Sequence, residues 1–291
     1  MAVRASVRGH IKGCGTVFEV TPTGAEKLLY SFTNFPDGKH PLGNLIMDGQ
    51  GNLYGITVHG GYYSRNCRDY GGRRHTSFTC GTVFEVTATG SEKVLYRFGG
   101  PPHDGLRPET LIMDAQGNLY GTTSLGGTNG AGIVFKLNSA GAETVLYNFC
   151  SQSGCADGRG PGSLVLDAQG NLYGATGGGG AYGDGTVFEL TPDGTETVLY
   201  NFTEVGGSGP GTLIIDLQGG VYGITGRDGV YGNGTVFELT PDGTLTVLYN
   251  FTGGADGGAP QSLIMDAQGN FYGTTGSGGA HGYGTVFKLT P

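Results

Sequence analysis

Short hydrophobic runs recur along the chain, each bounded by glycine, aspartate or proline. Four kinds of run follow one another in fixed order, and we name them blocks a to d. Block a reads LIMD, LVLD or LIID, block b GNLYG, block c GTVFE and block d VLYNF, with near variants of each. Each run is short and rich in β-branched and aromatic residues, which predicts a β-strand. Block a occurs at 45–48, 111–114, 164–167, 213–216 and 263–266.

Tight turns join these predicted strands. The sequence Asp-x-x-Gly-Asn, as in 114–118, links blocks a and b, and Thr-Pro-Asp-Gly, as in 191–194, links blocks c and d. Aspartate, proline and glycine each favour a defined turn position, and connections this short require antiparallel neighbours. Successive a blocks lie 66, 53, 49 and 50 residues apart, so each unit has the size of one four-stranded propeller blade.

The repeat therefore predicts an all-β fold, a five-bladed β-propeller of four-stranded antiparallel blades, as a single domain over 15–291. The last unit lacks block d, and the spare block d at 28–32 is expected to complete it, so that no blade is left with an open edge. Residues 1–14 are expected to be the remnant of an upstream loop. The alternatives are a six-bladed ring, which would lack two strands, and an open fragment of a longer repeat array. The predicted units lie near 45–98, 111–149, 164–202, 213–251 and 263–290.

Composition supports a glycine-rich all-β protein and disfavours some classes of partner. The 61 glycines favour turns over helices, and no apolar run reaches the roughly 18 residues that span a bilayer. The net charge is −8, with +2 over residues 1–160 and −10 over residues 161–291. A mostly acidic surface disfavours nucleic acid and anionic membranes. The N-terminus has no apolar segment typical of a signal peptide.

Five cysteines point to an oxidising compartment. Cys150 and Cys155 bracket a short loop, and Cys67 and Cys80 bracket an insertion of 15 residues between blocks b and c, so we expect two disulfides. Cys14 precedes block c as Cys80 does, which predicts a pairing partner upstream of Met1. No pair has CxxC spacing, so we predict neither a metal site nor a cofactor.

The unit DAQGNLYGTT, followed by a glycine-rich stretch, GTVFKLTP and VLYNF, resembles the GloVer tandem repeat of bacterial choice-of-anchor proteins. The resemblance covers residues 15–291. It implies a secreted or surface-anchored bacterial protein, and it implies no activity or catalytic residue.

The loops between blocks d and a are the first candidate site. Four of them share the sequence Asp-Gly-x-x-Pro, and their carboxylates could serve a glycoside hydrolase as acid and base or nucleophile. The candidates are Asp37, Asp104, Asp157 and Asp256. A polysaccharide lyase would instead use His40 or a tyrosine as base, with Arg107 and Arg159 neutralising a uronate. These aspartates also suit a plain turn.

The loops between blocks b and c are the second candidate site. They carry one variable large residue in register: Asn129, Tyr182, Tyr231 and His281. Flat side chains on a loop rim suit stacking against sugar rings. We therefore expect ligand binding by His40, Arg107, Arg159, Tyr182, Tyr231 and His281.

Two classes of function follow from these sites. The first is a secreted or cell-surface module, expected to be a monomer, that binds glycans or another extracellular ligand. The second is a carbohydrate-active enzyme, a glycoside hydrolase or polysaccharide lyase, with its site at the mouth of a central channel. A structural role as a stalk or adhesion repeat is a third hypothesis.

Overall fold

The computed structural model describes residues 2–6, 13–62, 80–100, 102–203 and 208–290. The chain divides into two compact units, Met1–Asn148 and Phe149–Pro291. Each unit consists of antiparallel β-sheets, and the described part of the chain has one short 3₁₀ helix, η1 (Ser153–Cys155).

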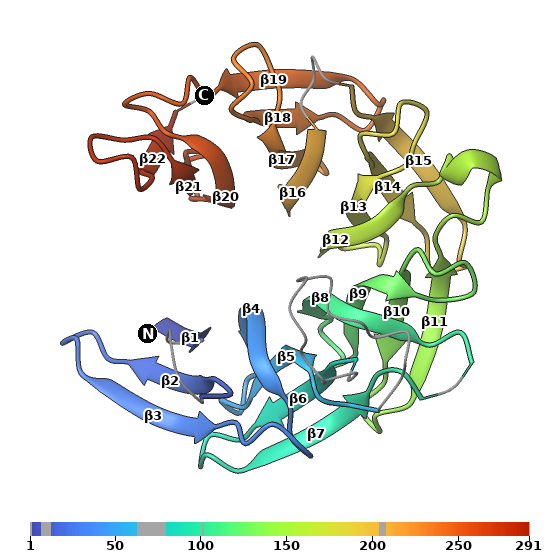
Figure 1. Ribbon diagram of the computed structural model, residues 1–291, viewed down its shortest axis with the longest axis vertical. Helices are drawn as coiled ribbons and strands as arrows, with labels where there is room; N and C mark the ends of the chain where they lie inside the picture. Colours follow the sequence, from blue (N-terminus) through green and yellow to red (C-terminus); the bar gives the residue numbers. More distant parts are fainter. Residues whose placement is uncertain (1, 7–12, 63–79, 101, 204–207, 291) are drawn as a thin grey trace, which may run out of the picture. The chain divides into compact units, whose positions relative to one another are not determined.

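The first unit contains three sheets (Figure 1). Sheet 1 consists of β1 (Ala2–Ser6), β2 (Thr16–Val20) and β3 (Glu26–Ser31). Sheet 2 consists of β4 (Lys39–Met47), β5 (Leu53–His59), β6 (Thr82–Val86) and β7 (Glu92–Arg97). Sheet 3 consists of β8 (Gly105–Met113), β9 (Leu119–Gly126), β10 (Ile133–Leu137) and β11 (Glu143–Asn148).

The second unit contains three further sheets. Sheet 4 consists of β12 (Arg159–Leu166), β13 (Leu172–Gly178), β14 (Thr186–Leu190) and β15 (Glu196–Asn201). Sheet 5 consists of β16 (Ser208–Ile215), β17 (Val221–Arg227), β18 (Thr235–Leu239) and β19 (Leu245–Asn250). Sheet 6 consists of β20 (Gly258–Met265), β21 (Phe271–Ser277) and β22 (Val286–Leu289).

The predicted fold class is confirmed: the protein is all-β, and its repeating element is a four-stranded antiparallel sheet in which neighbouring strands are consecutive in the chain. Blocks a to d form the four strands of a sheet in that order. Sheets 2 to 5 have all four strands, whereas sheets 1 and 6 have three in the part of the chain that the structure describes.

The predicted closure of the last unit by residues 28–32 is wrong. These residues belong to β3, which pairs with β2 in sheet 1, and sheet 6 does not include them. The turn after β2 explains this pairing, because Thr21 and Ala25 are hydrogen-bonded through Thr21 N–H at 2.9 Å and bring the next strand back at once. Local pairing of this kind costs less loop-closure entropy than pairing with a distant strand.

The prediction that residues 1–14 are only a loop remnant is also wrong for 2–6. These residues form β1, which pairs with β2 from Ala2 opposite Val20 to Ser6 opposite Thr16. The block c segment at 15–21 therefore forms the central strand of sheet 1.

Consecutive sheets within a unit pack through phenylalanines. The phenylalanine that ends block d lies edge-on against the block c phenylalanine of the next sheet: Phe98 and Phe135 have ring centroids 5.1 Å apart, and Phe202 and Phe237 5.3 Å apart. All four rings are fully buried. Edge-to-face contacts of this kind add to the burial of a large apolar surface.

The glycine that ends block b makes room for the block c phenylalanine. Gly174 lies directly opposite Phe188 on the neighbouring strand. A Cβ atom built on Gly174 would lie 2.2 Å from the ring carbon Cζ of Phe188. The repeated Tyr-Gly of block b is therefore fixed by packing inside each sheet.

Candidate functional site

Two loops meet at one end of sheets 3, 4 and 6, and we call the corresponding end of any sheet the loop end. One loop precedes the first strand of the sheet, and the other joins the second and third strands. They are hydrogen-bonded to each other: Gly127 N–H donates to Asp104 O at 2.9 Å in sheet 3, and Gly279 N–H donates to Gly254 O at 2.8 Å in sheet 6. In these sheets the two candidate sites of the sequence therefore belong to one surface.

The four candidate catalytic aspartates close their own loops. Asp37 accepts hydrogen bonds from Thr33 N–H at 2.8 Å, from the Thr33 hydroxyl at 2.9 Å and from the Tyr30 hydroxyl at 2.7 Å. Asp157 accepts from Ser151 N–H at 2.8 Å and from the Ser151 hydroxyl at 2.9 Å. Both aspartates are buried, with 3% and 0% of their surface exposed.

Asp256 repeats this arrangement at a half-buried position. It accepts from Thr252 N–H at 2.9 Å, from the Thr252 hydroxyl, and from the Tyr249 hydroxyl at 3.0 Å. Burial acts to raise the pKa of Asp256, but the hydrogen bonds from Thr252 and Tyr249 outweigh it and leave the pKa lowered. Asp256 is therefore an ionised loop-closing group at neutral pH.

Asp104 has a different balance of interactions. It accepts from Gly99 N–H at 2.6 Å and from Gly100 N–H at 3.1 Å, while its other oxygen, Oδ1, is buried without a hydrogen bond. Burial raises the pKa of Asp104 despite these bonds. The Tyr96 hydroxyl beside it donates to Glu143 at 3.2 Å. Burial raises the pKa of Glu143 to about 7, and the Asp104 carboxylate adds to the shift.

The same three residue types occur between sheets 1 and 2. The carboxylate of Asp37 contacts Tyr30, and Glu92 has its pKa raised to about 7, first by burial and then by Asp37. This tyrosine–aspartate–glutamate cluster was not predicted. Its signal in the sequence is the glutamate two residues before block d, which becomes Leu245 in the unit whose preceding loop lacks the aspartate.

The geometry assigns a loop-closing role to the four aspartates, each held within its own loop. Their catalytic role stays a prediction. A hydrolase would need two carboxyl groups roughly 5 to 9.5 Å apart on either side of a bound sugar.

His40 and Arg107 occupy an unusual backbone position at the loop end. Both have positive φ, 56° and 61°, where the corresponding residues of sheets 4 and 5 are Gly160 and Gly209, each with φ 62°. A side chain in this left-handed conformation costs roughly 1–2 kcal/mol. Each N–H reaches the preceding sheet, with His40 donating to Cys14 O at 2.7 Å and Arg107 to Cys80 O at 2.9 Å.

The side chains of these residues face different surroundings. The ring of His40 packs edge-on against His59 at 5.1 Å, and Arg107 is half exposed and lies 3.4 Å from the Glu109 carboxylate. Arg159 in the second unit is exposed. Both arginines begin first strands rather than lying in loops, since β8 starts at Gly105 and β12 at Arg159.

Exposed rings mark the loop ends of the second unit. Tyr182 in sheet 4 and Tyr231 in sheet 5 are 67% and 59% exposed, and His281 in sheet 6 is exposed at the corresponding position. Hydrogen bonds hold the loops that carry the two tyrosines. The Asn201 and Asn250 side chains accept from Ala181 and Val230 N–H at 2.7 and 3.0 Å. Rigid loops thus present rings to solvent.

Tyr283 is a ring that the sequence reasoning missed. It is 91% exposed, two residues after His281. The residue before block c is otherwise Cys14, Cys80, Ala131, Asp184 or Asn233, so an aromatic residue there was the available signal.

The predicted disulfide between Cys150 and Cys155 is present. Cys80 is also disulfide-bonded, and its predicted partner Cys67 lies outside the described residues. Cys14 is a free, partly buried thiol. Within the described residues, no group of three histidines, cysteines or carboxylates is placed to hold a metal ion. Among those residues, no helix has the length and apolar character needed to traverse a bilayer.

Two solved structures share this architecture. One is a catalytically inactive variant of virginiamycin B lyase from Staphylococcus aureus with quinupristin; the match has a TM-score of 0.61 and 14% identity and covers 94% of this chain and 74% of that one. The other is a gluconolactonase from Xanthomonas campestris, with a TM-score of 0.56 and 14% identity over 95% of this chain and 79% of that one. At this identity the likeness shows the fold alone, which is the β-propeller. No curated protein matches the chain in sequence.

The repeat itself identifies the family. Residues 5–159 and 218–291 match the Gloeobacter/Verrucomicrobia repeat, so the matched segments include the strands of sheets 2 and 3 and most of the second unit beyond sheet 4. With blocks a to d forming the strands of sheets 2 to 5, this chain belongs to the Gloeobacter/Verrucomicrobia repeat family.

Proposed function

We propose that this protein is a binding module for glycans, acting outside the cell through the loop ends of its sheets. The observation that carries the proposal is the exposure of Tyr182 and Tyr231 at the same position of two successive sheets, 67% and 59%. Exposed aromatic rings on rigid loops stack against the apolar faces of sugar rings at small cost in side-chain entropy.

The state of the aspartates supports binding rather than hydrolysis. A reacting carboxylate must contact the substrate, yet the oxygens of Asp37 and Asp157 are buried and engaged by donors of their own loops. The disulfide between Cys150 and Cys155 supports an extracellular location, since structural disulfides persist in oxidising compartments.

The test is binding of neutral and acidic oligosaccharides to a glycan array, followed by calorimetry of each hit with Tyr231→Ala and Tyr182→Ala. Loss of one stacking ring should weaken binding about three- to tenfold. Leu217→Ala is the matched control, because Leu217 is fully exposed in the turn between the first and second strands of sheet 5, away from the loop end. An array without hits, or hits that both tyrosine variants retain at full affinity, would contradict the proposal.

The first unit fits acidic glycans better than neutral ones. His40 and Arg107 hold side chains where two other sheets have glycine, at a backbone position that disfavours any side chain. Local strain retained in a structure points to a functional demand on the side chain. Arg107→Gly should weaken acidic ligands selectively, whereas Ala259→Gly at the equivalent position of sheet 6 should leave binding unchanged.

A carbohydrate-active enzyme is the second candidate function. One observation favours it: Asp104 and Glu143 both have raised pKa values and share Tyr96 as a neighbour, a pattern found at acid–base sites. Asp104→Asn should then abolish glycoside or uronate turnover while the thermal midpoint of unfolding changes little. Turnover that survives both Asp104→Asn and Asp157→Asn would contradict the hydrolase hypothesis. If the unmodified chain shows no turnover, only the binding-module hypothesis remains.

A further inference from the structure

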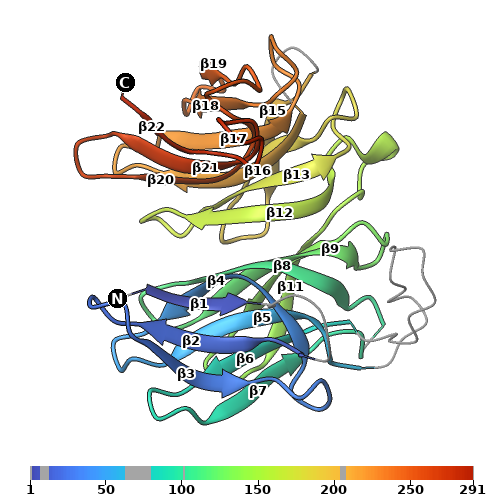
Figure 2. The same cartoon turned by 60° about the vertical axis from the view of Figure 1, so that its left-hand side comes forward.

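Sheet 3 carries three polar side chains where two other sheets have glycine. Arg107 and Glu109 lie in β8, and Ser124 lies in β9, the strand that pairs with β8 in the first unit (Figure 2). In sheets 3, 4 and 5 a first-strand proline lies opposite a second-strand threonine, and equivalent positions are counted from that pair. The equivalent residues are all glycine: Gly160, Gly162 and Gly177 in sheet 4, and Gly209, Gly211 and Gly226 in sheet 5. A sheet of this kind therefore folds without any side chain at the three positions.

The three side chains of sheet 3 contact one another. The Ser124 hydroxyl donates to Glu109 Oε1 at 2.7 Å, and Arg107 Nε lies 3.4 Å from the same oxygen. The Arg107 side chain is 52% exposed. A guanidinium has five N–H donors in a planar arrangement, so the contact through Nε leaves donors for a further partner.

The backbone that carries Arg107 is held against sheet 2. The Arg107 N–H donates to Cys80 O at 2.9 Å. The next residue, Pro108, packs so closely on Gly81 that a Cβ atom built there would lie 2.5 Å from Pro108 Cδ. Arg107 keeps a φ of 61° in this position, and strained backbone of this kind clusters at ligand sites. The strand therefore presents the guanidinium from a rigid support.

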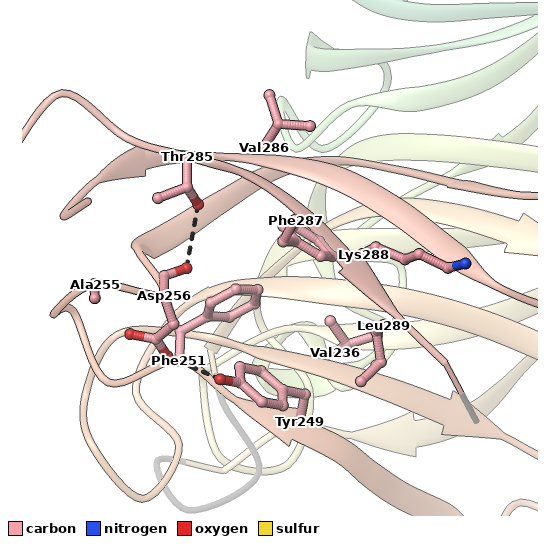
Figure 3. A pocket seen from close by; sticks show the side chains of 10 residues that line it. All are labelled: Val236, Tyr249, Phe251, Ala255, Asp256, Thr285, Val286, Phe287, Lys288 and Leu289. Atoms are coloured by element: carbon pink, nitrogen blue, oxygen red, sulfur yellow. Dashed lines mark hydrogen bonds between the residues drawn. The ribbon is translucent and has the colours of Figure 1, made fainter. Parts of the chain in front are cut away.

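Glu109 differs from the loop aspartates because one of its oxygens is available. Asp256 uses both of its oxygens: Oδ1 accepts from the Thr252 hydroxyl, and Oδ2 accepts from the Tyr249 hydroxyl at 3.0 Å (Figure 3). Within the described ranges of the chain, the contacts of the Glu109 carboxylate are made through Oε1, and its side chain is 24% exposed. Oε2 can therefore accept a hydrogen bond from a ligand hydroxyl.

A cation and an anion fixed side by side favour a ligand that has both an acid group and hydroxyl groups. A guanidinium binds a carboxylate through paired N–H bonds, and a carboxylate is a strong acceptor for a hydroxyl donor. The negative charge of Glu109 disfavours a bare anion at the same place. A uronic acid, which carries a carboxylate on a hydroxylated ring, satisfies both groups at once.

We propose that Arg107, Glu109 and Ser124 form a subsite for a uronic acid. Arg107 binds the carboxylate of the sugar, Glu109 accepts a hydrogen bond from a ring hydroxyl, and Ser124 positions Glu109. The inference names the acidic sugar of the proposed glycan-binding function, and it rests on that function for the choice of a sugar as ligand. A site built to bond a ligand hydroxyl rejects analogues that lack it.

The test is an NMR titration of the 291-residue chain with methyl β-glucuronide, methyl β-glucoside and acetate. The glucuronide should bind about tenfold more tightly than the glucoside, which lacks the charge, or acetate, which lacks the hydroxyls. Arg107→Lys keeps the charge but loses the paired donors, and it should weaken the glucuronide about fivefold. Gln261→Ala is the matched control, because Gln261 is the exposed residue at the position of Glu109 in sheet 6, and it should leave the affinity unchanged.

Glu109→Gln separates this subsite from a plain anion site. The amide keeps the size of the side chain, but it is a weaker acceptor and removes the negative charge. Affinity for the glucuronide should fall about fivefold, while affinity for acetate stays the same or rises. If both affinities rise together, Arg107 acts as a plain cation and the inference is overturned.

Ser124→Gly tests the positioning of Glu109. It introduces the residue that sheets 4 and 5 have at this position, so the fold should be kept. Affinity for the glucuronide should fall about threefold, because the hydroxyl that holds Glu109 is lost. Ser124→Thr, which retains the hydroxyl, should restore the affinity. A threonine variant as weak as the glycine variant would contradict the positioning role.

Failure of this inference can be told apart from failure of the proposed function. Array hits that Tyr231→Ala weakens, but that Arg107→Lys and Glu109→Gln leave unchanged, would overturn the uronic acid subsite and retain the glycan-binding module. Glucuronide binding that Arg107→Lys and Glu109→Gln both weaken, with no hit on the array, would support the subsite and contradict the proposed function. If the unmodified chain shows no saturable glucuronide binding, the subsite is overturned.

Discussion

At the scale of single residues, the repeat is dictated by contacts inside each sheet. The block a aspartate accepts the N–H groups of its turn, and in sheet 6 the Asn270 side chain holds the pKa of Asp266 down to about 2. The block b tyrosine donates to the same carboxylate, as Tyr272 does to Asp266 at 3.0 Å. The sequence predicted these aspartates as turn residues, and the hydrogen bonds confirm it.

Gly174→Ala tests the packing reason for the block b glycine. The new methyl group would overlap the buried ring of Phe188, and overpacking of this kind costs about 1–3 kcal/mol of unfolding free energy. Gly162→Ala is the control, because no atom lies within 4 Å of its Cβ position. Urea titration checks both, and equal stability of the two variants would contradict the packing argument.

Glu143→Gln tests the buried cluster with Tyr96 and Asp104. Because the pKa of Glu143 is raised to about 7 from 4.5, the folded state binds its proton more tightly than the unfolded chain. Its contribution to stability is full below about pH 4.5 and is lost as the pH rises through 7. As the pH rises from 5 to 8, the unmodified chain should therefore lose stability that the glutamine variant keeps. Thermal midpoints across this range check the sign, and a constant difference would refute it.

At the scale of elements, the strands form at blocks a to d, and the loops between them differ in sequence from unit to unit. The first strand of each sheet extends further than block a alone, since β4 starts at Lys39 and β20 at Gly258. The prolines of the loop motif fit inside these strands because the register shifts directly after them, between Pro161 and Leu164 in sheet 4 and between Pro210 and Leu213 in sheet 5. Sequence reasoning placed these residues in loops because they lie between blocks d and a.

Cys155→Ser tests the loop that precedes sheet 4. The disulfide closes a separation of five residues, and the chain-entropy model gives about 2 kcal/mol for a loop of this size. Guanidinium denaturation should show that loss, while Cys14→Ser, which removes a free thiol, should change stability little. If Cys155→Ser unfolds at the same midpoint as the unmodified chain, the loop is held by Asp157 and its hydrogen bonds alone.

At the scale of the whole molecule, charge limits the partners. The net charge is −8 and the isoelectric point is about 5.1. We expect no binding of a duplex DNA probe at 0.15 M salt, measured by anisotropy, because phosphate binding draws its affinity from clustered cations. Binding that weakens steeply with added salt would contradict this expectation.

The sequence by itself determined the strands, their order within each sheet and the turns between them, because these depend on contacts between residues close in the chain. Only the tertiary structure decided the partner of residues 28–32 and the place of the block c segment at 15–21, since a strand edge can pair with any complementary edge. It also decided that Asp37 and Asp157 are buried and accept hydrogen bonds from their own loops. Burial and hydrogen bonding depend on which neighbours reach a residue, and identical repeats conceal that difference.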